Sequence, residues 1–315
     1  MSYKNELKGN NDDLRAILET VNSLPEAGGG GGGGSEEEWI GDGNTHIWIH
    51  LGEGRTSPMM GLCVNGAVGI DWGDGTTPDT LTGTSTSTAK WTHPHNYAAP
   101  GDYIITLMVD GEMGFYGSSS SNQYSGILRH SASGDTRNYL YRNAVQKIEV
   151  GDGVTSIGDS AFRYCYGLTS ITIPDSVNSI GSYAFANCYG LASITIPDGV
   201  TSIGSSAFAN CYSLASITIP DSVKSIYNYA FQNCYSLASI TIPDSVTSIS
   251  ASAFSYCYGL AKLRFESATP PTVANSNAFN GFPTDCIISV PVGSLAAYTS
   301  ATNYPSASTY TYVEE

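Results

Sequence analysis

The stretch Leu168-Thr-Ser-Ile-Thr-Ile173 decides the fold of the second half of the chain, because its pattern returns at a fixed interval. The leucine recurs every 23 residues, at Leu168, Leu191, Leu214, Leu237 and Leu260. Phenylalanines keep the same period at Phe162, Phe185, Phe208, Phe231 and Phe254, and isoleucines do so at Ile173, Ile196, Ile219 and Ile242, with Phe265 ending the series. Such a period predicts a solenoid in which each repeat forms one coil.

Within one repeat, the residue pattern assigns a direction to each side chain. Leu168, Ile171 and Ile173 are expected to point inward, and Thr172 to point out of a short parallel strand that ends at Pro174. A single coil cannot bury its own apolar edge, so each coil needs a neighbour. We therefore predict a mainly β protein with a solenoid over residues 144–268 and a degenerate capping unit over residues 269–315.

The repeat unit Cys-x-x-Leu-x-x-Ile-x-Ile-Pro-x-x-Val-x-x-Ile-x-x-x-Ala-Phe-x-x-Cys closely resembles the Treponema-type, BspA-like leucine-rich repeat. Five copies agree at nearly every core position, and the resemblance covers roughly half of the chain. The segments Thr269-Pro-Pro-Thr272, Asn277-Ala-Phe279 and Val290-Pro-Val-Gly-Ser294 are similar to the C-terminal capping unit of that family. The resemblance implies a surface protein that binds host or matrix partners.

The chain before the repeats divides into four parts. Residues 1–27 predict a short helix that anchors the chain or forms oligomers through residues 11–24, with a disordered leader as the alternative. Residues 28–38 contain seven consecutive glycines and predict a flexible linker. Residues 39–115 show the alternation of β-strands, and residues 116–143 are rich in Ser, Gly and Asn and predict a connecting loop.

Residues 39–115 also carry a second resemblance. Asp71-Trp-Gly-Asp-Gly-Thr76, His95-Asn-Tyr97 and Pro100-Gly-Asp-Tyr103 resemble the polycystic-kidney-disease (PKD) type of immunoglobulin-like β-sandwich. In that family these segments are packing signatures, and His93 is an additional histidine that the pattern does not require. The resemblance covers about a quarter of the chain and implies a spacer or a module that contacts carbohydrate or protein.

Composition excludes several classes of partner. The chain has 13 Lys and Arg against 28 Asp and Glu, for a formal net charge of −15, so it has no basic face for nucleic acid or for an anionic membrane. No run of 18 apolar residues spans a bilayer, and the first residues do not read as a secretory signal. No nucleophile elbow, phosphate loop or His-Glu-x-x-His motif occurs, so we expect no enzymatic activity and no cofactor.

Cysteines, histidines and aspartates are residue types of this chain that could bind a metal ion. Close Cys-x-x-Cys pairs are absent, and the spacing of Asp71, Asp74 and Asp79 is not that of an EF-hand loop, so we predict no metal site, with calcium as the minor alternative. The pairs His46/His50 and His93/His95 are expected to serve in packing and in turn hydrogen bonds, with metal binding as the minor alternative. One cysteine per repeat predicts a ladder of buried thiols, with disulfides between coils as the minor alternative, at Cys165, Cys188, Cys211, Cys234 and Cys257.

The candidate binding residues are repeated side chains on the outside of the coils. A tyrosine row beside the strand face is expected from Tyr166, Tyr189, Tyr212, Tyr235 and Tyr258. Next to it, the strands expose Thr172, Thr195, Thr218 and Thr241, together with Ser170, Ser193, Ser216 and Ser239. The alternative is that the stacked tyrosines only cover the edge of the coils.

These observations predict a non-enzymatic adhesion or recognition protein. The first hypothesis is a phage tail-associated or receptor-binding virion protein that contacts a cell-surface glycan or protein and binds other virion proteins through residues 11–24. The alternatives are a BspA-like adhesin on a bacterial surface, whose export signal is missing from this sequence, and an intracellular repeat scaffold. The oligomeric state is left open, including a homo-oligomer.

Overall fold

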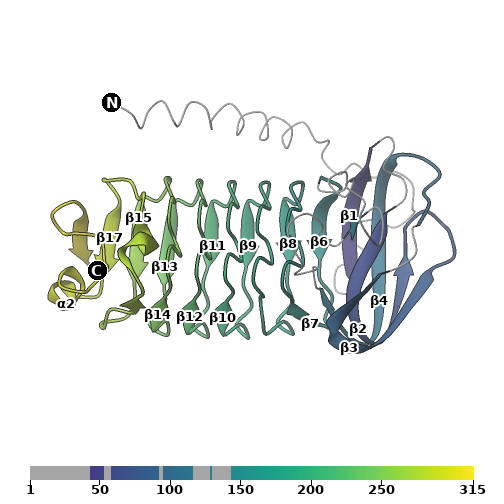
Figure 1. The fold of residues 1–315 in the computed structure, drawn as a ribbon, viewed down its shortest axis with the longest axis horizontal. Coiled ribbons are helices and arrows are strands. Elements are labelled where there is room, and N and C mark those ends of the chain that lie inside the picture. The colour runs from purple at the N-terminus through teal and green to yellow at the C-terminus, as the bar shows by residue number, and fades with distance from the viewer. Residues whose placement is uncertain (1–42, 53–57, 92–94, 116–127, 130–142) are drawn as a thin grey trace.

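The computed structural model describes residues 43–52, 58–91, 95–115, 128–129 and 143–315. The predicted N-terminal helix, the glycine linker, His93 and most of the predicted loop lie outside these residues. The described chain is mainly β and forms an elongated stack of coils with a module of long strands at its N-terminal end (Figure 1).

Each coil of the solenoid contributes one strand to a parallel row along its length, which we call the front strands (Figure 1). Equivalent repeat positions pair in register, as Ser193 with Ser216 and Thr195 with Thr218. The solenoid predicted from the period of 23 residues is therefore confirmed. The front strands are β6 (Val145–Glu149), β8 (Ser170–Thr172), β9 (Ser193–Thr195), β11 (Ser216–Thr218), β13 (Ser239–Ile242), β15 (Lys262–Phe265), β17 (Ile287–Val290) and β18 (Thr311–Glu314).

A second parallel row, the back strands, follows in each coil after the proline that ends the front strand. Isolated bridges continue this row where a coil has no named strand, as Ile180 pairs with both Ile157 and Ile203. The back strands are β7 (Val154–Ile157), β10 (Ser202–Ile203), β12 (Ser225–Ile226), β14 (Ser248–Ile249) and β16 (Thr272–Val273).

The interior of the coils is filled by the periodic apolar residues, which are buried as predicted. The phenylalanines form a ladder in which Phe185, Phe208 and Phe231 stack with ring centroids 5.3 and 5.4 Å apart and planes within 6° of parallel. Ring pairs at these distances add to the stabilisation that burial already provides. The apolar core is therefore built from rows of identical side chains, one row for each position of the repeat.

Each coil turns back through an arch that contains residues with positive φ. Asn187, Asn210 and Asn233 have φ between 60° and 64°, and asparagine tolerates this left-handed region better than most side chains. Backbone N–H groups of the arch donate to the following coil, as Phe185 donates to the carbonyl of Ala207 at 2.8 Å. The arch thus satisfies its own backbone polar groups by stacking on the next arch.

The N-terminal module continues both rows of the solenoid. β1 pairs antiparallel with β6 and so extends the front strands, while the end of β4 pairs parallel with β7 and extends the back strands. Phe115 lies at the end of β4, and its ring centroid is 5.0 Å from that of Phe162. It therefore adds a ring to the phenylalanine ladder. The module strands are β1 (Thr45–Leu51), β2 (Met59–Asp71), β3 (Asp79–Trp91), β4 (Gly101–Phe115) and β5 (Leu128–Arg129).

The sheet order β3-β2-β4-β1-β6-β8 therefore runs without a break from the module into the first coils. The same buried cluster includes Trp72 of the module and Phe162 of the solenoid. Solenoids need an end that hides their terminal apolar face. The module serves as the N-terminal cap, and its core and that of the solenoid are one.

The C-terminal end of the solenoid is covered by an irregular unit with two short helices. Phe279, in the 3-10 helix η3 (Ser276–Phe279), continues the ladder 6.2 Å from Phe254. Tyr298, in the short helix α2 (Leu295–Thr299), is buried and donates its hydroxyl hydrogen to the carbonyl of Ser267 at 2.8 Å. These side chains close the last coil with aromatic surface.

Candidate recognition surfaces of the solenoid

The front strands of four coils present two ranks of hydroxyl groups to solvent, which we call the hydroxyl face. The alternation of the strand places an isoleucine inward and the residues on either side of it outward. Seven of these eight residues are exposed and Thr241 is half-buried. The hydroxyl face consists of Ser170, Ser193, Ser216 and Ser239 in one rank and Thr172, Thr195, Thr218 and Thr241 in the other.

None of these eight hydroxyls forms a hydrogen bond with another described residue. Three serines that follow the front strands behave differently: the hydroxyls of Ser176, Ser222 and Ser245 donate to Val carbonyls of the preceding coil. These three hydroxyls therefore hold adjacent coils together, whereas those of the hydroxyl face remain available to solvent or to a ligand.

The cations that border the hydroxyl face lie at its two ends. Lys147, in register with Ser170, lies 3.1 Å from Glu149 and 4.4 Å from the centre of the Trp48 ring. At the other end, Lys262 lies in register with Ser239 and its ammonium is 2.7 Å from Glu315. Each cation therefore faces a carboxylate, and the face between them is uncharged.

The five predicted tyrosines form a continuous row, as the sequence indicated. Their ring centroids are 4.4 to 5.5 Å apart, and the planes of Tyr212 and Tyr235 differ by 1°. Because the rings stack face to face, each inner ring covers the faces of its neighbours, and the row presents ring edges and hydroxyls to solvent. Burial and neighbouring phenols raise the pKa of Tyr189, and in the same way raise that of Tyr235 to about 12.

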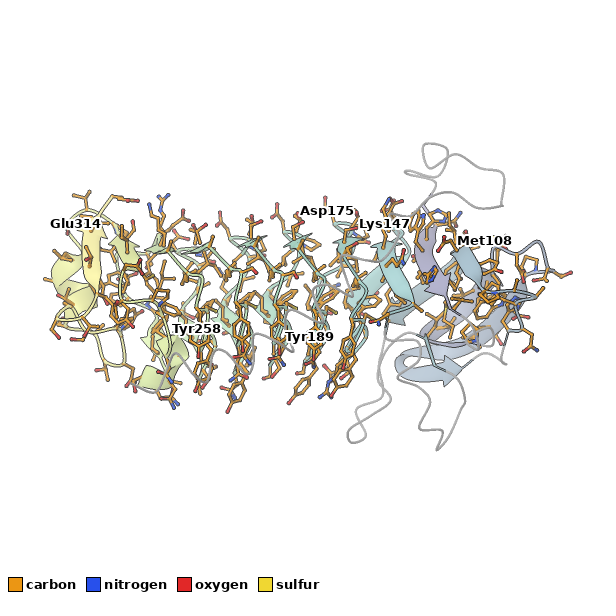
Figure 2. All side chains as sticks on the ribbon, turned by 90° about the horizontal axis from the view of Figure 1, so that it is seen from above. Met108, Lys147, Asp175, Tyr189, Tyr258 and Glu314 are labelled. Atoms are coloured by element: carbon orange, nitrogen blue, oxygen red, sulfur yellow. The ribbon has the colours of Figure 1, made fainter. Side chains whose placement is uncertain are left out.

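The structure does not bring the tyrosine row and the hydroxyl face together. Figure 2 shows Tyr189 and Tyr258 on the opposite side of the solenoid from Lys147, whose register with Ser170 places it on the hydroxyl face. The neighbours of the tyrosine row are instead arch residues, as Tyr189 lies 3.5 Å from the side-chain oxygen of Asn187. The two candidate sets are therefore separate surfaces.

Sequence reasoning missed a row of asparagines beside the tyrosines. The side-chain amide of Asn210 donates to Asn187 at 2.9 Å, and that of Asn233 donates to Asn210 at 2.7 Å. The signal was present in the sequence, because these asparagines are also 23 residues apart and each directly precedes a ladder cysteine. The row ties neighbouring arches together.

The ladder cysteines are free thiols buried in the coils, as predicted. Each thiol from Cys188 onward donates to a phenylalanine carbonyl of an earlier coil, as Cys188 does to Phe162 at 3.2 Å. Burial raises the pKa of Cys257 to about 12, so these thiols stay protonated at neutral pH. Within the described ranges, no group of three or more His, Cys, Asp or Glu side chains could hold a metal ion.

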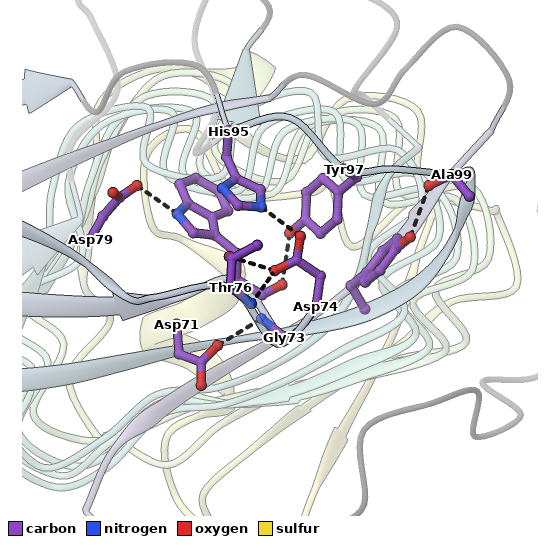
Figure 3. Close-up of polar contacts among 10 residues, drawn as sticks. Asp71, Gly73, Asp74, Thr76, Asp79, His95, Tyr97 and Ala99 are labelled. Carbon is purple, nitrogen blue, oxygen red and sulfur yellow. Dashed lines mark hydrogen bonds and ion pairs between the residues drawn. The ribbon is translucent and has the colours of Figure 1, made fainter.

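The turn between β2 and β3 is held by a polar and aromatic cluster (Figure 3). The His95 ring stacks on Trp72 at 4.6 Å and its Nε2 lies 2.9 Å from a carboxylate oxygen of Asp74. Tyr97 donates its hydroxyl hydrogen to the Trp72 carbonyl at 2.9 Å. Burial works against ionisation of Asp74, but hydrogen bonds from Thr76 and His95 outweigh it and lower the pKa of that carboxyl.

This cluster explains the motif residues that were considered for metal binding. Asp71 accepts a hydrogen bond from the backbone of Gly73 at 2.9 Å, and Asp79 accepts one from the Trp72 indole at 2.8 Å. The carboxylates therefore each satisfy a separate donor of the turn. Their role in the described structure is to fix the turn and the packing of Trp72.

Comparison with known proteins identifies the class to which the coils belong. Residues 136–284 match the family described as "BspA type Leucine rich repeat region", in six copies. The solenoid is therefore a leucine-rich-repeat region of the BspA type, in agreement with the resemblance noted in the sequence. A search of curated protein sequences gives no match.

Solved structures of leucine-rich-repeat proteins also match. A leucine-rich-repeat protein of T. pallidum is 32% identical, over 38% of this chain and 60% of that protein, with a TM-score of 0.36. A leucine-rich cell surface protein from Faecalibacterium prausnitzii is 25% identical, over 56% of this chain and 62% of that protein, with a TM-score of 0.30. The chain thus spans somewhat less than two thirds of the length of these two structures. Among the described residues, no helix is long and apolar enough to cross a membrane.

Proposed function

We propose that this chain is a non-enzymatic recognition protein that attaches to a cell surface through the hydroxyl face of its solenoid. The observation that carries the proposal is the set of eight outward hydroxyls that make no hydrogen bond within the described protein. Groups of this kind are available to a partner without the loss of an internal bond. The BspA-type repeats support a role in adhesion or recognition.

The tyrosine row is the second candidate surface, and its geometry favours it less. Aromatic residues bind ligands best when a ring face or a large ring surface is open to the partner. Here the faces of the inner rings are covered by neighbouring rings about as closely as in the buried phenylalanine ladder. We therefore infer that the tyrosine row covers the edge of the coils, which is the alternative given for it under the sequence.

Two settings are compatible with attachment to a cell surface. A virion appendage is the first, because the predicted anchor at residues 11–24 and the glycine linker would attach one end of the chain and leave the solenoid free. The surface of a bacterium is the second. Labelled antibody against the solenoid separates them by electron microscopy, since it decorates phage particles in the first setting and cell envelopes in the second.

The binding experiment introduces two bulky side chains on the hydroxyl face to block access of a ligand. Thr195→Arg combined with Ser239→Arg adds two long side chains, and the fold accepts such residues because Arg264 occupies the position equivalent to Thr241 in the next coil. We expect attachment to target cells, measured by flow cytometry of the labelled protein, to fall about tenfold. The matched control is Thr201→Arg, at an exposed position next to the back strand β10, which should attach like the parent.

A third variant tests the tyrosine row in the same assay. Tyr189, Tyr212 and Tyr235 are replaced together by Ser, and thermal melting establishes the folded fraction. We expect the folded triple variant to attach within about twofold of the parent. Loss of attachment in this variant, with full attachment of the arginine variant, would move the binding site to the tyrosine row.

A further inference from the structure

The hydroxyl face restricts the chemistry of its partner, if the proposed function holds. Each Ser or Thr hydroxyl donates one hydrogen bond and accepts others, so a matching partner must offer both donors and acceptors. The groups are spaced about 4.8 Å apart from coil to coil and about 6.6 Å apart along each strand. A partner that contacts several coils must therefore be extended and must repeat its polar groups.

Charge on and around the face argues against an anionic partner. The cations at its ends already lie beside carboxylates, as in the pair of Lys147 with Glu149 and the pair of Lys262 with Glu315. An anion would have to compete with these carboxylates for Lys147 or Lys262. Along one edge, an exposed aspartate follows the front strand in each coil, which repels anions further, at Asp175, Asp198, Asp221 and Asp244.

The composition of the face also argues against a folded protein partner. Protein interfaces gain most of their affinity from a few buried anchors, chiefly Trp, Tyr and Arg. None of the exposed large hydrophobic side chains in the described part of the chain lies on β8, β9, β11 or β13. These strands are also flanked on both sides by front strands of the adjacent coils (Figure 1), so an added strand has no room to pair beside them.

We propose that the hydroxyl face binds a neutral polysaccharide that runs along the solenoid across β8, β9, β11 and β13. Sugar hydroxyls supply donors and acceptors without charge, and a polymer repeats them at every unit. The threonine rank is stiff because β-branching restricts χ1, so little rotamer freedom is lost on binding. Contacts that are weak at each coil add up along a polymer that touches several coils.

The experiment uses the full chain in native affinity electrophoresis through gels that contain purified polysaccharides. The neutral probes are an α-glucan, a β-glucan, a mannan, a galactan and a xylan, and the charged probes are hyaluronate and chitosan. We expect at least one neutral polysaccharide to retard the protein, equally at low and high salt because no ion pair is involved.

Isosteric variants assign the binding to the hydroxyls. Thr195→Val with Thr218→Val keeps the β-branched shape of two exposed strand residues and removes only their hydroxyls, so folding is preserved. We expect retardation by the neutral polysaccharide to weaken about tenfold. The matched control is Thr201→Val with Ser179→Ala, two exposed residues beside the back row whose hydroxyls form no hydrogen bond with another described residue, and it should be retarded like the parent.

Three outcomes overturn the proposal. The first is retardation only by a charged polysaccharide with loss at high salt, and the second is equal retardation of the valine variant and the parent. The third is no retardation by any neutral probe while cells still bind the parent and release the arginine variant. In that last case the neutral-polysaccharide inference fails and the proposed recognition function stands. If the arginine variant attaches to cells as well as the parent does, the neutral-polysaccharide inference and the proposed function of the hydroxyl face both fail.

Discussion

At the scale of single residues, the arch asparagines combine two roles that are usually separate. Asn210 adopts a φ of 62°, which costs most side chains of the L configuration about 1 kcal/mol or more. Its amide also donates to Asn187 at 2.9 Å and accepts from Asn233 at 2.7 Å. A residue at this position must therefore tolerate the left-handed region and continue the amide row.

Two substitutions at Asn210 separate these roles. Asn210→Gly keeps the left-handed backbone and removes the amide, and we expect it to lower the free energy of unfolding by about 1 kcal/mol. Asn210→Ala adds the backbone cost, and we expect a loss of about 2 kcal/mol. Urea denaturation followed by circular dichroism measures both. Equal losses in the two variants would show that the backbone conformation contributes nothing.

At the scale of structural elements, the coils stabilise one another through rows of identical residues. The inner rows are phenylalanine and cysteine, and the outer rows are asparagine and tyrosine. Because the coils stack in parallel and in register, a feature of one repeat becomes a line along the molecule. The tyrosine row adds a pH dependence to this arrangement, because burial and, to a smaller extent, neighbouring phenols raise the pKa of its tyrosines.

Alkaline solution should destabilise the solenoid through the tyrosine row. Burial, together with Tyr212 and Tyr258, raises the pKa of Tyr235 from 10.0 to about 12. The folded state therefore holds the phenol proton more tightly than the unfolded state. This stabilising contribution is complete below about pH 10 and is lost as the pH rises toward 12. Urea denaturation across this pH range should show falling stability.

The matched control is Tyr212→Phe with Tyr235→Phe, which keeps the stacked rings and removes two phenols. Its stability should fall less steeply with pH than that of the parent, because fewer groups bind protons differently in the two states. Identical slopes would contradict a contribution from the row and would assign the alkaline effect to other groups.

At the scale of the whole molecule, the N-terminal module and the solenoid share one buried core, so we expect them to unfold together. Trp72 and Phe162 belong to the same buried cluster, and Phe115 connects the two parts because its ring packs at a tilt against that of Phe162. All four tryptophans lie before residue 92, whereas residues 143–315 contain none. Tryptophan fluorescence therefore reports the module, and far-ultraviolet circular dichroism is dominated by the longer solenoid.

Substitution of Phe115 tests whether the two parts unfold together. Phe115→Ala leaves a cavity beside Phe162, and we expect it to lower the free energy of unfolding by about 3 kcal/mol. Fluorescence and circular dichroism should give coincident transitions that shift together. Met108→Ala, at a partly exposed position in β4, serves as the control with a small effect. A shift of the fluorescence transition alone would mean that the module unfolds independently.

The sequence by itself determined the solenoid and the contents of its coils. Five copies of one unit fix which residues point inward, because parallel stacking repeats every position in the next coil. For this reason the burial of Leu168 and Cys188, the exposure of Thr172 and the stacking of Tyr189 on its neighbours could all be predicted. The asparagine row follows from the same logic, because Asn187, Asn210 and Asn233 are also 23 residues apart.

Only the tertiary structure decided how these rows are placed around the coil. Tyr189 and the hydroxyl face lie on different sides because the arch and the front strand occupy different parts of the cross-section, and a linear period carries no information about that shape. The sequence also could not predict that β1 continues the front strands and that β4 continues the back strands. This continuation depends on pairing between strands whose sequences are unlike. No repeat in the sequence indicates which strands pair, so only the contact between distant segments in the folded chain determines it.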